Sequence, residues 1–550
     1  MAKCLLALIL SVTAALAQIP RPDPAFGSIT GVVRNSVTRA PLADIRVQIG
    51  PFSATTDPQG QFSFQQVFPG RYWVSVSDER RAGRGGVYAL VVAGQQLSGV
   101  DIPIKLGGTI SGRVVDDVKK PVAGASVLLL ERRFEAGEMA YARQQTVVTG
   151  KDGEYRLERV PAERSYLLLV KKPLAAPASA DKVPADVEKR ERTMLPAYYP
   201  ASLDPQGAQP VTLIPDENRE GADIRMASAP SYCMDGALEV PGGAPLPSLT
   251  ILEQQALVAG SAFAPVTVRV TAEGNFRACG FHPGEYQLDA NNGRNTNPPP
   301  AGSVSGYAHV TITNHDASGV KLLARQPAAI SGDAAWDPPP PGNAAEKLVR
   351  VGLTKRIDFD RHADQDGPPS GMSGAFVYAR EVAVPGSFTL DRVPVDDYQL
   401  EAYPLPAGCY LKAASYDGIS VLHRLLRLMS DGAGGRLRLV LACDGGFLNA
   451  RVTDREGNPV SHVNLYLMPA EAESAAVLSA TLRRIEVENG WSGGARPLPP
   501  GKYLALACDV ALDGTAEPIL KLWRARSKGT EVEIGPNATV QVTLQTAGVD

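Results

Sequence analysis

A repeated order of short motifs constrains this chain more than any other feature of its 550 residues. The order is a Gly-x-Ile-x-Gly-x-Val segment, a Pro-Leu-Ala or Pro-Val-Ala step, a glycine-containing turn, and a proline turn before an apolar segment. It occurs over residues 27–76 and again over 108–170. Self-similarity of this kind indicates one supersecondary unit that is used more than once. The fold is therefore predicted to be that of the unit, repeated along the chain.

Each piece of the unit has the chemistry of a strand or a turn. Ile29 and Val33 belong to a segment in which apolar residues alternate with others, as a half-buried strand requires. Residues 57–60 have turn chemistry, because Asp bonds its own backbone and Gly accepts a positive φ. Phe62 and Phe64 then fall on one face of the next strand. We predict that each unit is a small antiparallel β-sandwich of about seven strands.

Weaker copies of the same motifs extend the repeat to the end of the chain. They occur over residues 273–288, 385–400 and 446–505. A chain of this length also exceeds what one hydrophobic core supports. We predict an all-β chain of tandem Greek-key sandwiches, with domains at 27–106, 107–226 (with an insertion at 173–197), 227–325, 326–442 and 443–548.

The combined motifs resemble those of the carboxypeptidase regulatory-like domain family. The resemblance is specific over 27–172, looser over 380–465 and slight elsewhere. It implies a transthyretin-like (prealbumin-like, Ig-like) sandwich, a fold that is also grouped with carbohydrate-binding-like folds. Residues 409–418 are similar to a segment of long bacterial secreted proteins built from such repeats. The family's motifs are structural, so the resemblance assigns no binding residue.

The N-terminus has the pattern of a secretory signal peptide over residues 1–17. Lys3 supplies the positive end, residues 5–16 are largely apolar, and Ala15-Leu16-Ala17 is a small-x-small cleavage site. No later segment has the roughly 18 uninterrupted apolar residues that a spanning helix needs. We expect a protein that is secreted, periplasmic or on the cell surface, with no membrane span after signal removal. An N-terminal membrane anchor is the alternative interpretation.

Five cysteines remain after signal removal, so at least one of them has no intramolecular partner. An oxidising compartment permits disulfides. The places of the cysteines in the repeat predict two disulfides, Cys233–Cys279 and Cys443–Cys508, which leave Cys409 unpaired. The pairing Cys409–Cys443 is an alternative.

The motifs that resemble catalytic or metal-binding sites are better explained as turns and loops of the fold. His282-Pro283-Gly284-Glu285 has the spacing of two zinc ligands, but the repeat aligns it with the turn at residues 69–72. The acidic stretch 358–367 lacks the first carboxylate and the closing Glu of a calcium-binding EF-hand loop. No Gly-x-Ser-x-Gly nucleophile elbow is present. We predict no catalytic, cofactor or metal site.

Exposed aromatic residues are the candidates for ligand contact, because aromatic rings stack on sugar faces. The alternation places Tyr72 in the core and Trp73 on the opposite face. Trp73, Tyr198 and Tyr199 are the predicted stacking residues, while Trp336 and Trp491 are further aromatic candidates. The formal charge of −3 and the lack of a long basic run argue against a nucleic-acid partner.

These observations favour a non-catalytic exported scaffold or adhesion protein. Its expected partner is a surface polysaccharide or another envelope protein. One alternative is an array of carbohydrate-binding modules. A second is an undetected hydrolase within residues 227–442, where the repeat is most divergent.

Overall fold

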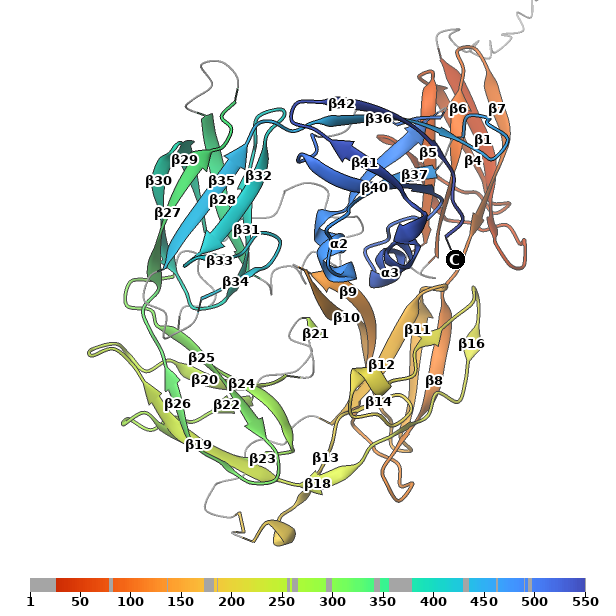
Figure 1. Cartoon of the computed structure of the whole chain (residues 1–550). Coiled ribbons are helices and arrows are strands. Elements are labelled where there is room, and N and C mark those ends of the chain that lie inside the picture. The colour runs from red at the N-terminus through yellow and green to blue at the C-terminus, as the bar shows by residue number, and fades with distance from the viewer. Residues whose placement is uncertain are drawn as a thin grey trace, which may run out of the picture. The chain divides into compact units, whose positions relative to one another are not determined.

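The computed structural model describes residues 26–78, 83–135, 137–172, 183–184, 186–254, 258–259, 266–292, 299–340, 347–355, 378–428, 435–460, 463–488, 490–492 and 497–549. The predicted signal peptide and the acidic stretch 358–367 lie outside these residues. Regular structure in the described residues is overwhelmingly β-strand, which confirms the all-β prediction (Figure 1). None of the described helices is long and apolar enough to cross a membrane.

The described chain divides into two compact units. The first contains the described residues up to Ile110, together with Glu158–Arg164 and Thr212–Arg219. The second contains Ser111–Leu157, Ser165–Val211 and the residues from Glu220 onward. Below, "domain" denotes each successive group of sheets in the described residues.

The first domain, red to orange in Figure 1, is a sandwich of two sheets with strand orders β4-β1-β7 and β3-β2-β5-β6. Both sheets contribute to one apolar core, in which Ile29 and Val33 of the first sheet lie with Val47 and Val74 of the second. The strands are β1 (Gly27–Asn35), β2 (Arg46–Ile49), β3 (Phe52–Thr55), β4 (Gln61–Val67), β5 (Gly70–Asp78), β6 (Gly83–Val91) and β7 (Gln96–Ile104).

The turn before β4 has the hydrogen bond and the backbone conformation that its residue types predict. The Asp57 carboxylate accepts a hydrogen bond from the backbone N–H of Gln61 at 2.8 Å, and Gly60 adopts a φ of +72°. A left-handed φ of this kind favours glycine, since other residues would place Cβ against the backbone. The chain therefore enters β4 with Phe62 and Phe64 directed into the core.

A tyrosine closes the following turn in the same way in four of the domains. Its hydroxyl donates a hydrogen bond to the backbone carbonyl oxygen four residues earlier, as in the tyrosine corner of Ig-like sandwiches. The pairs and their O···O distances are Tyr72 to Phe68 (3.0 Å), Tyr286 to His282 (2.7 Å), Tyr398 to Pro394 (2.9 Å) and Tyr503 to Pro499 (2.7 Å).

The second domain has one sheet that is buried on both faces. The strand orders are β14-β12-β9-β10-β21, with β15 beside β12, and β11-β8-β16, with β17 beside β8. The apolar runs Val127–Leu130 and Tyr166–Val170 of the first sheet are buried throughout. The strands are β8 (Gly108–Val115), β9 (Ser126–Glu135), β10 (Glu138–Val148), β11 (Glu154–Val160), β12 (Ser165–Lys171), β14 (Ala197–Tyr198), β15 (Val211–Thr212), β16 (Asn218–Arg219) and β17 (Ile224–Arg225).

The predicted insertion at 173–197 is described only in part. From residue 183 on it contains the short 3-10 helix η3 (Val187–Lys189) and strand β13 (Arg192–Met194), which pairs with β18 (Ser228–Pro230). A further 3-10 helix, η4 (Pro205–Gly207), follows β14.

The third domain is a sandwich with strand orders β23-β19-β26 and β22-β20-β24-β25. Both sheets share one core. Its strands are β19 (Tyr232–Glu239), β20 (Ser248–Gln254), β22 (Val266–Val268), β23 (Asn275–Phe281), β24 (Gly284–Asn291), β25 (Ser305–Ile312) and β26 (Ala317–Leu323). The short strand β21 (Val258–Ala259) follows β20 but pairs with β10 of the second domain.

The fourth domain is a sandwich of the same kind, with strand orders β30-β27-β35-β32-β33 and β29-β28-β31-β34. Its two sheets also share one core. Its strands are β27 (Ala328–Trp336), β28 (Lys347–Lys355), β29 (Tyr378–Val384), β30 (Gly386–Val393), β31 (Asp397–Tyr403), β32 (Tyr410–Tyr416), β33 (Ile419–Ser420), β34 (Leu425–Arg427) and β35 (Arg436–Ala442).

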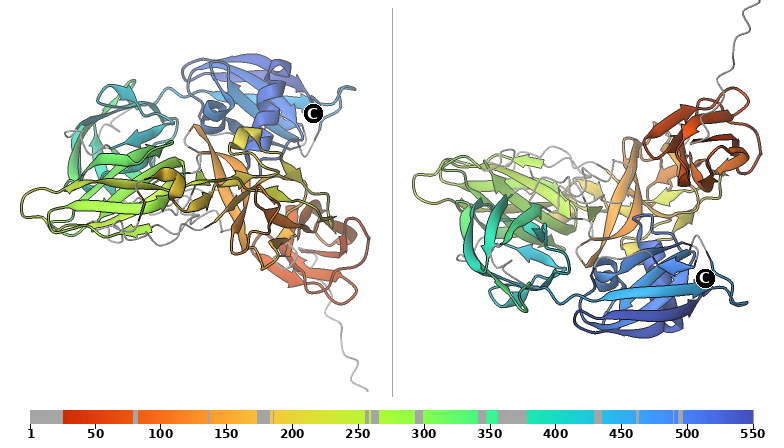
Figure 2. Two further views of the ribbon diagram at one scale, coloured as in Figure 1. Left: turned by 90° about the horizontal axis from the view of Figure 1, so that it is seen from below. Right: turned by 90° about the horizontal axis from the view of Figure 1, so that it is seen from above.

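The last domain differs from the predicted sandwich. Its strands form one continuous sheet, β41-β40-β37-β38-β39-β36-β42, because the short β39 pairs with both β38 and β36. Two helices lie against this sheet through Leu478, Ile519 and Leu522 (Figure 2). The elements are β36 (Phe447–Thr453), β37 (Val463–Pro469), α2 (Ala475–Thr481), β38 (Arg483–Glu488), β39 (Trp491–Ser492), β40 (Gly501–Cys508), α3 (Ala516–Ala525), η5 (Arg526–Lys528), β41 (Thr530–Ile534) and β42 (Thr539–Gln545).

One pairing rule is common to all five domains, and it corrects the expectation of purely antiparallel sandwiches. The opening strand of each domain pairs in parallel with the last strands of that domain. The pairs are β1 with β7, β8 with β16 and β17, β19 with β26, β27 with β35, and β36 with β42. Opening and closing strands are far apart in sequence, so no hairpin forces them to run in opposite directions.

A glycine in the opening strand β19 lies where the parallel partner β26 approaches closely. At Gly236 in β19, a Cβ would lie 2.0 Å from the carbonyl oxygen of Val320 in β26. Real Cβ atoms do not approach a backbone oxygen this closely. A side chain at this position would therefore push the closing strand away.

We predict that Gly236→Ala destabilises the third domain by about 1–3 kcal/mol, because the added methyl group overlaps β26. Hydrogen exchange measured by mass spectrometry should show faster exchange in β26 (Ala317–Leu323). Gly242→Ala is the matched control, since a Cβ at Gly242 meets nothing within 4 Å. Equal protection of β26 in the two variants would contradict the prediction.

Candidate functional site

An exposed aromatic pair lies on the outer face of the first domain. Alternation along β5 directs Val74 and Val76 into the core and Trp73 outward. Tyr88 of β6 is the cross-strand partner of Trp73. The two side chains are 48% and 41% exposed, and their ring centroids are 4.7 Å apart with planes tilted by 59°. Cross-strand aromatic contacts of this kind hold both rings in place.

Two neighbours fix the position of these rings. A Cβ at Gly86 would lie 2.5 Å from the indole of Trp73, so the indole occupies the space above this glycine. The Arg71 guanidinium carbon lies 4.4 Å from the centroid of the Tyr88 ring, within the range of a cation–π contact. Arg71, Trp73 and Tyr88, with the exposed Leu90 beside them, are called the aromatic face below.

The predicted stacking residues differ in where the structure places them. Trp73 is at the surface, and its contact with a ligand stays a prediction. Tyr198 is 1% exposed and packs among Leu128, Leu167 and their neighbours in the apolar layer outside β9 and β12, so its prediction as a stacking residue is wrong. The physical reason is that β14 pairs with β12 and shares its buried face. Tyr199 is half-buried.

Tyr88 is the member of the aromatic face that the sequence prediction missed. A signal was present, because Val87, Ala89 and Val91 alternate around it as core residues of a strand would. That alternation places Tyr88 on the same outer face as Trp73. The hairpin register that sets the two rings side by side is not visible in this pattern.

A second group of chemically active side chains is buried in the second unit. Glu253 of β20 lies between Lys171 of β12 and His282, which follows β23. Its carboxylate contacts the Lys171 ammonium and lies 3.2 Å from Nε2 of His282. Nδ1 of His282 is 2.8 Å from the Pro283 carbonyl oxygen. Both ring nitrogens thus lie next to oxygen atoms.

Burial and neighbouring charges shift the pKa values of this group in opposite directions. Burial raises the pKa of the Glu253 carboxyl, but the hydrogen bond from His282 and the Lys171 charge outweigh it and hold the pKa below its usual value. Burial lowers the pKa of the Lys171 ammonium despite the opposing effect of Glu253. The three side chains form a shielded ion cluster that joins strands of the second and third domains.

This cluster accounts for the zinc-like motif. His282 is buried against Glu253, whereas Glu285 points to the exposed side of β24. The two residues therefore do not face a common metal position. Within the described part of the chain, no three His, Cys, Asp or Glu side chains gather as a metal site would need.

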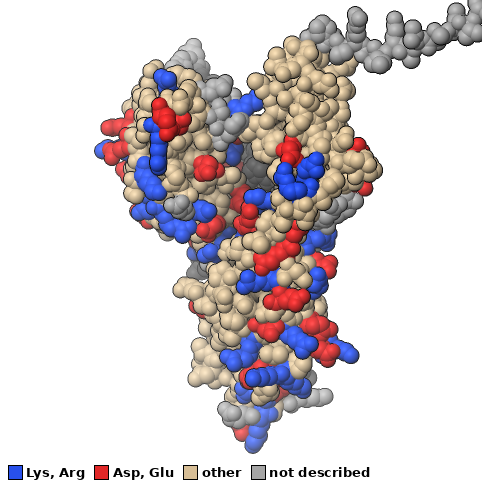
Figure 3. Space-filling view, turned by 90° about the vertical axis from the view of Figure 1, so that its right-hand side faces the viewer, with Lys and Arg blue, Asp and Glu red and all other residues tan. Residues whose placement is uncertain are grey.

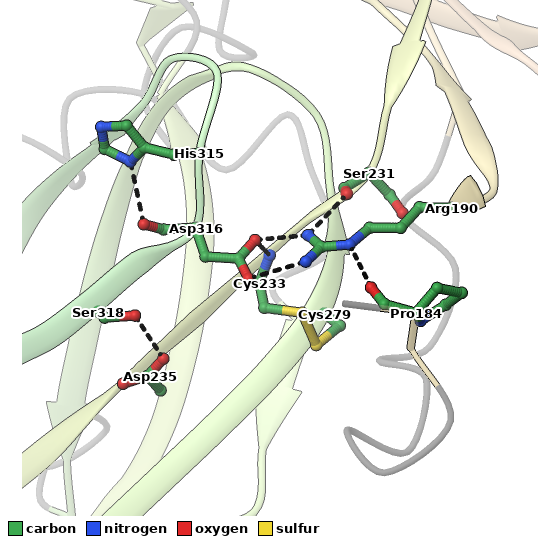
Figure 4. Close-up of polar contacts among 9 residues, drawn as sticks. All are labelled: Pro184, Arg190, Ser231, Cys233, Asp235, Cys279, His315, Asp316 and Ser318. Atoms are coloured by element: carbon green, nitrogen blue, oxygen red, sulfur yellow. Dashed lines mark hydrogen bonds and ion pairs between the residues drawn. A yellow bond between two sulfur atoms is a disulfide. The ribbon is translucent and has the colours of Figure 1, made fainter. Parts of the chain in front are cut away.

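An arginine fastens the remainder of the insertion to the third domain (Figure 4). The Arg190 guanidinium donates two hydrogen bonds to Asp316, at 2.6 and 3.1 Å, and one to the Pro184 carbonyl oxygen at 2.7 Å. Asp316 also accepts the backbone N–H of Cys233 at 2.9 Å. Burial raises the pKa of Asp316, but these donors outweigh it and hold the pKa low. The bidentate geometry is that of a structural clamp.

One predicted disulfide is present and the other is wrong. Cys233 and Cys279 are direct partners in the β19–β23 register and form a disulfide. Cys443 pairs with Cys409, which was the alternative, and not with Cys508. Cys409 and Cys443 lie one residue beyond the paired ends of β32 and β35, whereas Cys508 ends β40 and packs beneath the helices.

Basic and acidic side chains do not separate into regions of one charge on the face shown in Figure 3. Lys and Arg are interspersed there with Asp and Glu. A phosphate backbone is contacted by a continuous basic stripe. This face has no such stripe.

We predict that Glu253→Gln destabilises the protein by about 3–5 kcal/mol at neutral pH, because it leaves the Lys171 charge buried without a counterion. The pKa of Glu253 is lowered by folding, so its stabilisation is complete above about pH 4.3 and is lost as the pH falls through the lower folded-state value. The difference from wild type should therefore shrink in acid. Urea unfolding between pH 7 and pH 3 measures it, with the exposed Glu285→Gln as control; a difference that does not change with pH would refute the assignment.

We also predict that the chain without its signal peptide has one thiol, Cys508, which reacts with alkylating reagents only after unfolding. The thiol is buried, and burial raises its pKa, so little nucleophilic thiolate is available. Thiol counts on native and denatured protein, followed by peptide mapping without reduction, give the measurement. A reactive thiol in the native protein, or a linked peptide containing Cys508, would overturn this assignment.

The carboxypeptidase regulatory-like domain family matches residues 28–105 and 109–195. No protein of curated function matches the chain. A streptococcal ancillary pilin is 13% identical, with a TM-score of 0.19 over 54% of this chain and 99% of that chain. The minor pilin of Streptococcus agalactiae is 12% identical, with a TM-score of 0.18 over 40% and 96%.

The Bacillus anthracis TIE protein is 10% identical, with a TM-score of 0.14 over 92% of this chain and 75% of that chain. The motifs and the family match agree for the N-terminal part of the chain. Residues 28–105 and 109–195 each match the carboxypeptidase regulatory-like domain, so this part of the chain is similar to two such domains in tandem.

Proposed function

We propose that this chain is a non-catalytic exported scaffold that presents the aromatic face of its first domain to an extracellular partner. The observation that carries the proposal is the exposed pair Trp73–Tyr88, held in position by Gly86 and Arg71. Large rings held at the surface make no contribution to the domain core. Aromatic residues are enriched where proteins bind their partners.

The titratable groups of the second and third domains support a structural role. Glu253 and His282 lie in the region where a hydrolase site was the alternative, but they are only 6% and 1% exposed and lie against each other. Arg190 and Asp316 are joined to each other and to backbone groups. Such groups hold strands and domains together, whereas a hydrolytic site must meet its substrate.

The rule that the opening and closing strands of a domain lie side by side supports the scaffold part of the proposal. Each domain starts and ends in one sheet, so another domain can follow without rearrangement of the preceding one. A tandem array of such domains can hold the aromatic face of the first domain at a distance from the domains that follow it. The alternative of an array with a sugar site in every domain has no comparable observation in its favour.

We predict that the full chain without its signal peptide is retained on insoluble envelope material of its host and that Trp73→Ala reduces this retention at least about tenfold, because the platform for the partner is lost. Trp491→Ala is the matched control, since Trp491 is a surface tryptophan of the last domain with 57% exposure. Co-sedimentation gives the bound fraction. Equal retention of Trp73→Ala and wild type would refute the binding role of the aromatic face.

A further inference from the structure

We propose that the aromatic face binds an acidic polysaccharide, with sugar rings stacked on Trp73 and Tyr88 and the carboxylates of the sugar contacted by arginines of the same sheet. This inference rests on the proposed function and adds the chemical class of the partner. It is argued from the residues on the outer face of the sheet β3-β2-β5-β6.

The two rings offer a surface of the shape that a sugar ring covers. Their planes are tilted by 59°, so they form a shallow angled platform rather than a flat stack. The indole is held down above Gly86, where any larger residue would displace it. Because the platform exists before binding, little side-chain freedom is lost when a ligand lies on it.

Uncharged hydrogen-bonding groups lie next to the rings on the same face. Gln48 of β2 is the cross-strand partner of Ser75 on one side and Ser53 on the other. Gln48 and Ser53 are exposed, and Ser75, two residues along β5 from Trp73, is half-buried. Hydroxyl and amide groups both donate and accept hydrogen bonds, which matches the hydroxyl groups of a sugar.

The charge of this face is positive. Arg71 lies at the aromatic pair, and the exposed Arg46 lies beyond Gln48 along β2. The four strands contain a single acidic residue, Asp78, and its side chain is buried. A guanidinium contacts a carboxylate through paired hydrogen bonds, so an anionic ligand complements this face.

The mixture of groups favours a polysaccharide over a protein partner. The centre of a protein–protein interface is apolar and poor in charged groups. On this face arginine, serine and glutamine side chains alternate with the aromatic rings, and Leu90 is the exposed aliphatic residue among them. An extended polymer of hydroxylated, carboxylated rings matches each of these groups.

The test is affinity electrophoresis of the full chain without its signal peptide in gels that contain polygalacturonate or its methyl ester. The ester keeps the sugar rings and removes the charge. We expect polygalacturonate to bind about tenfold more tightly than the ester, since each charge-assisted contact adds a factor of this order. Trp73→Ala should bind neither polymer, while Trp491→Ala should behave as wild type.

Arg71→Gln and Arg46→Gln separate stacking from charge. Each should weaken the binding of polygalacturonate and leave the binding of the ester unchanged, so that the preference for the acid falls. Hydrogen exchange over β5 and β6 shows whether each variant keeps the native sheet. Equal binding of acid and ester by wild type, or an unchanged preference in both arginine variants, would overturn the inference.

The outcome also distinguishes this inference from the function on which it rests. Retention on envelope material that depends on Trp73, without binding to polygalacturonate, would refute the acidic polysaccharide and leave a different partner for the same face. Retention that does not depend on Trp73, with no binding to polygalacturonate, would refute both. Binding of polygalacturonate by Trp73→Ala would identify plain charge attraction and overturn the stacking role.

Discussion

The fold of every domain depends on its opening strand. In the first domain β1 is hydrogen-bonded on one side to β4, antiparallel, and on the other to β7, parallel. The strand is therefore central in its sheet, and the rest of the domain is arranged about it. Its second glycine, Gly31, admits the closing strand, because a Cβ there would lie 2.2 Å from the Val100 carbonyl oxygen of β7. The two glycines and the alternating apolar residues of this motif are thus explained by the packing of the opening strand against its neighbours.

Residues that suggest chemistry in this sequence mostly serve that architecture. The motif at 282–285 is a tyrosine corner in which the His282 carbonyl accepts the hydroxyl of Tyr286 at 2.7 Å. The same turn elsewhere uses Phe, Pro and Pro at this position, so the fold needs only the backbone oxygen. The His282 side chain is then available for the ion pair with Glu253. Glu253 also contacts Lys171, so it connects this turn of the third domain to β12 of the second domain.

Periodicity predicted what depends on local sequence and missed what depends on distant pairing. Strands, turns and the outward direction of Trp73 follow from alternation, which each segment carries by itself. The burial of Tyr198 depends on its pairing with Leu169, and the Cys409–Cys443 disulfide on the register of β32 with β35. The helix α3 was missed because the repeat led to a strand interpretation throughout. Lys171 and Glu253 are far apart in sequence, and neither carries a local signal of its ion pair.

Neighbouring residues on β5 contribute to stability and, in our proposal, to recognition. Tyr72 packs against the core and donates its hydroxyl to the Phe68 carbonyl oxygen, whereas Trp73 lies on the outer face above Gly86. Successive side chains of a strand point to opposite faces, so changes at Trp73 leave the core contacts of Tyr72 intact. The outer sheet face can thus acquire a ligand without altering the sandwich. The proposed binding face therefore consists of residues that the structural motifs of this sandwich do not specify.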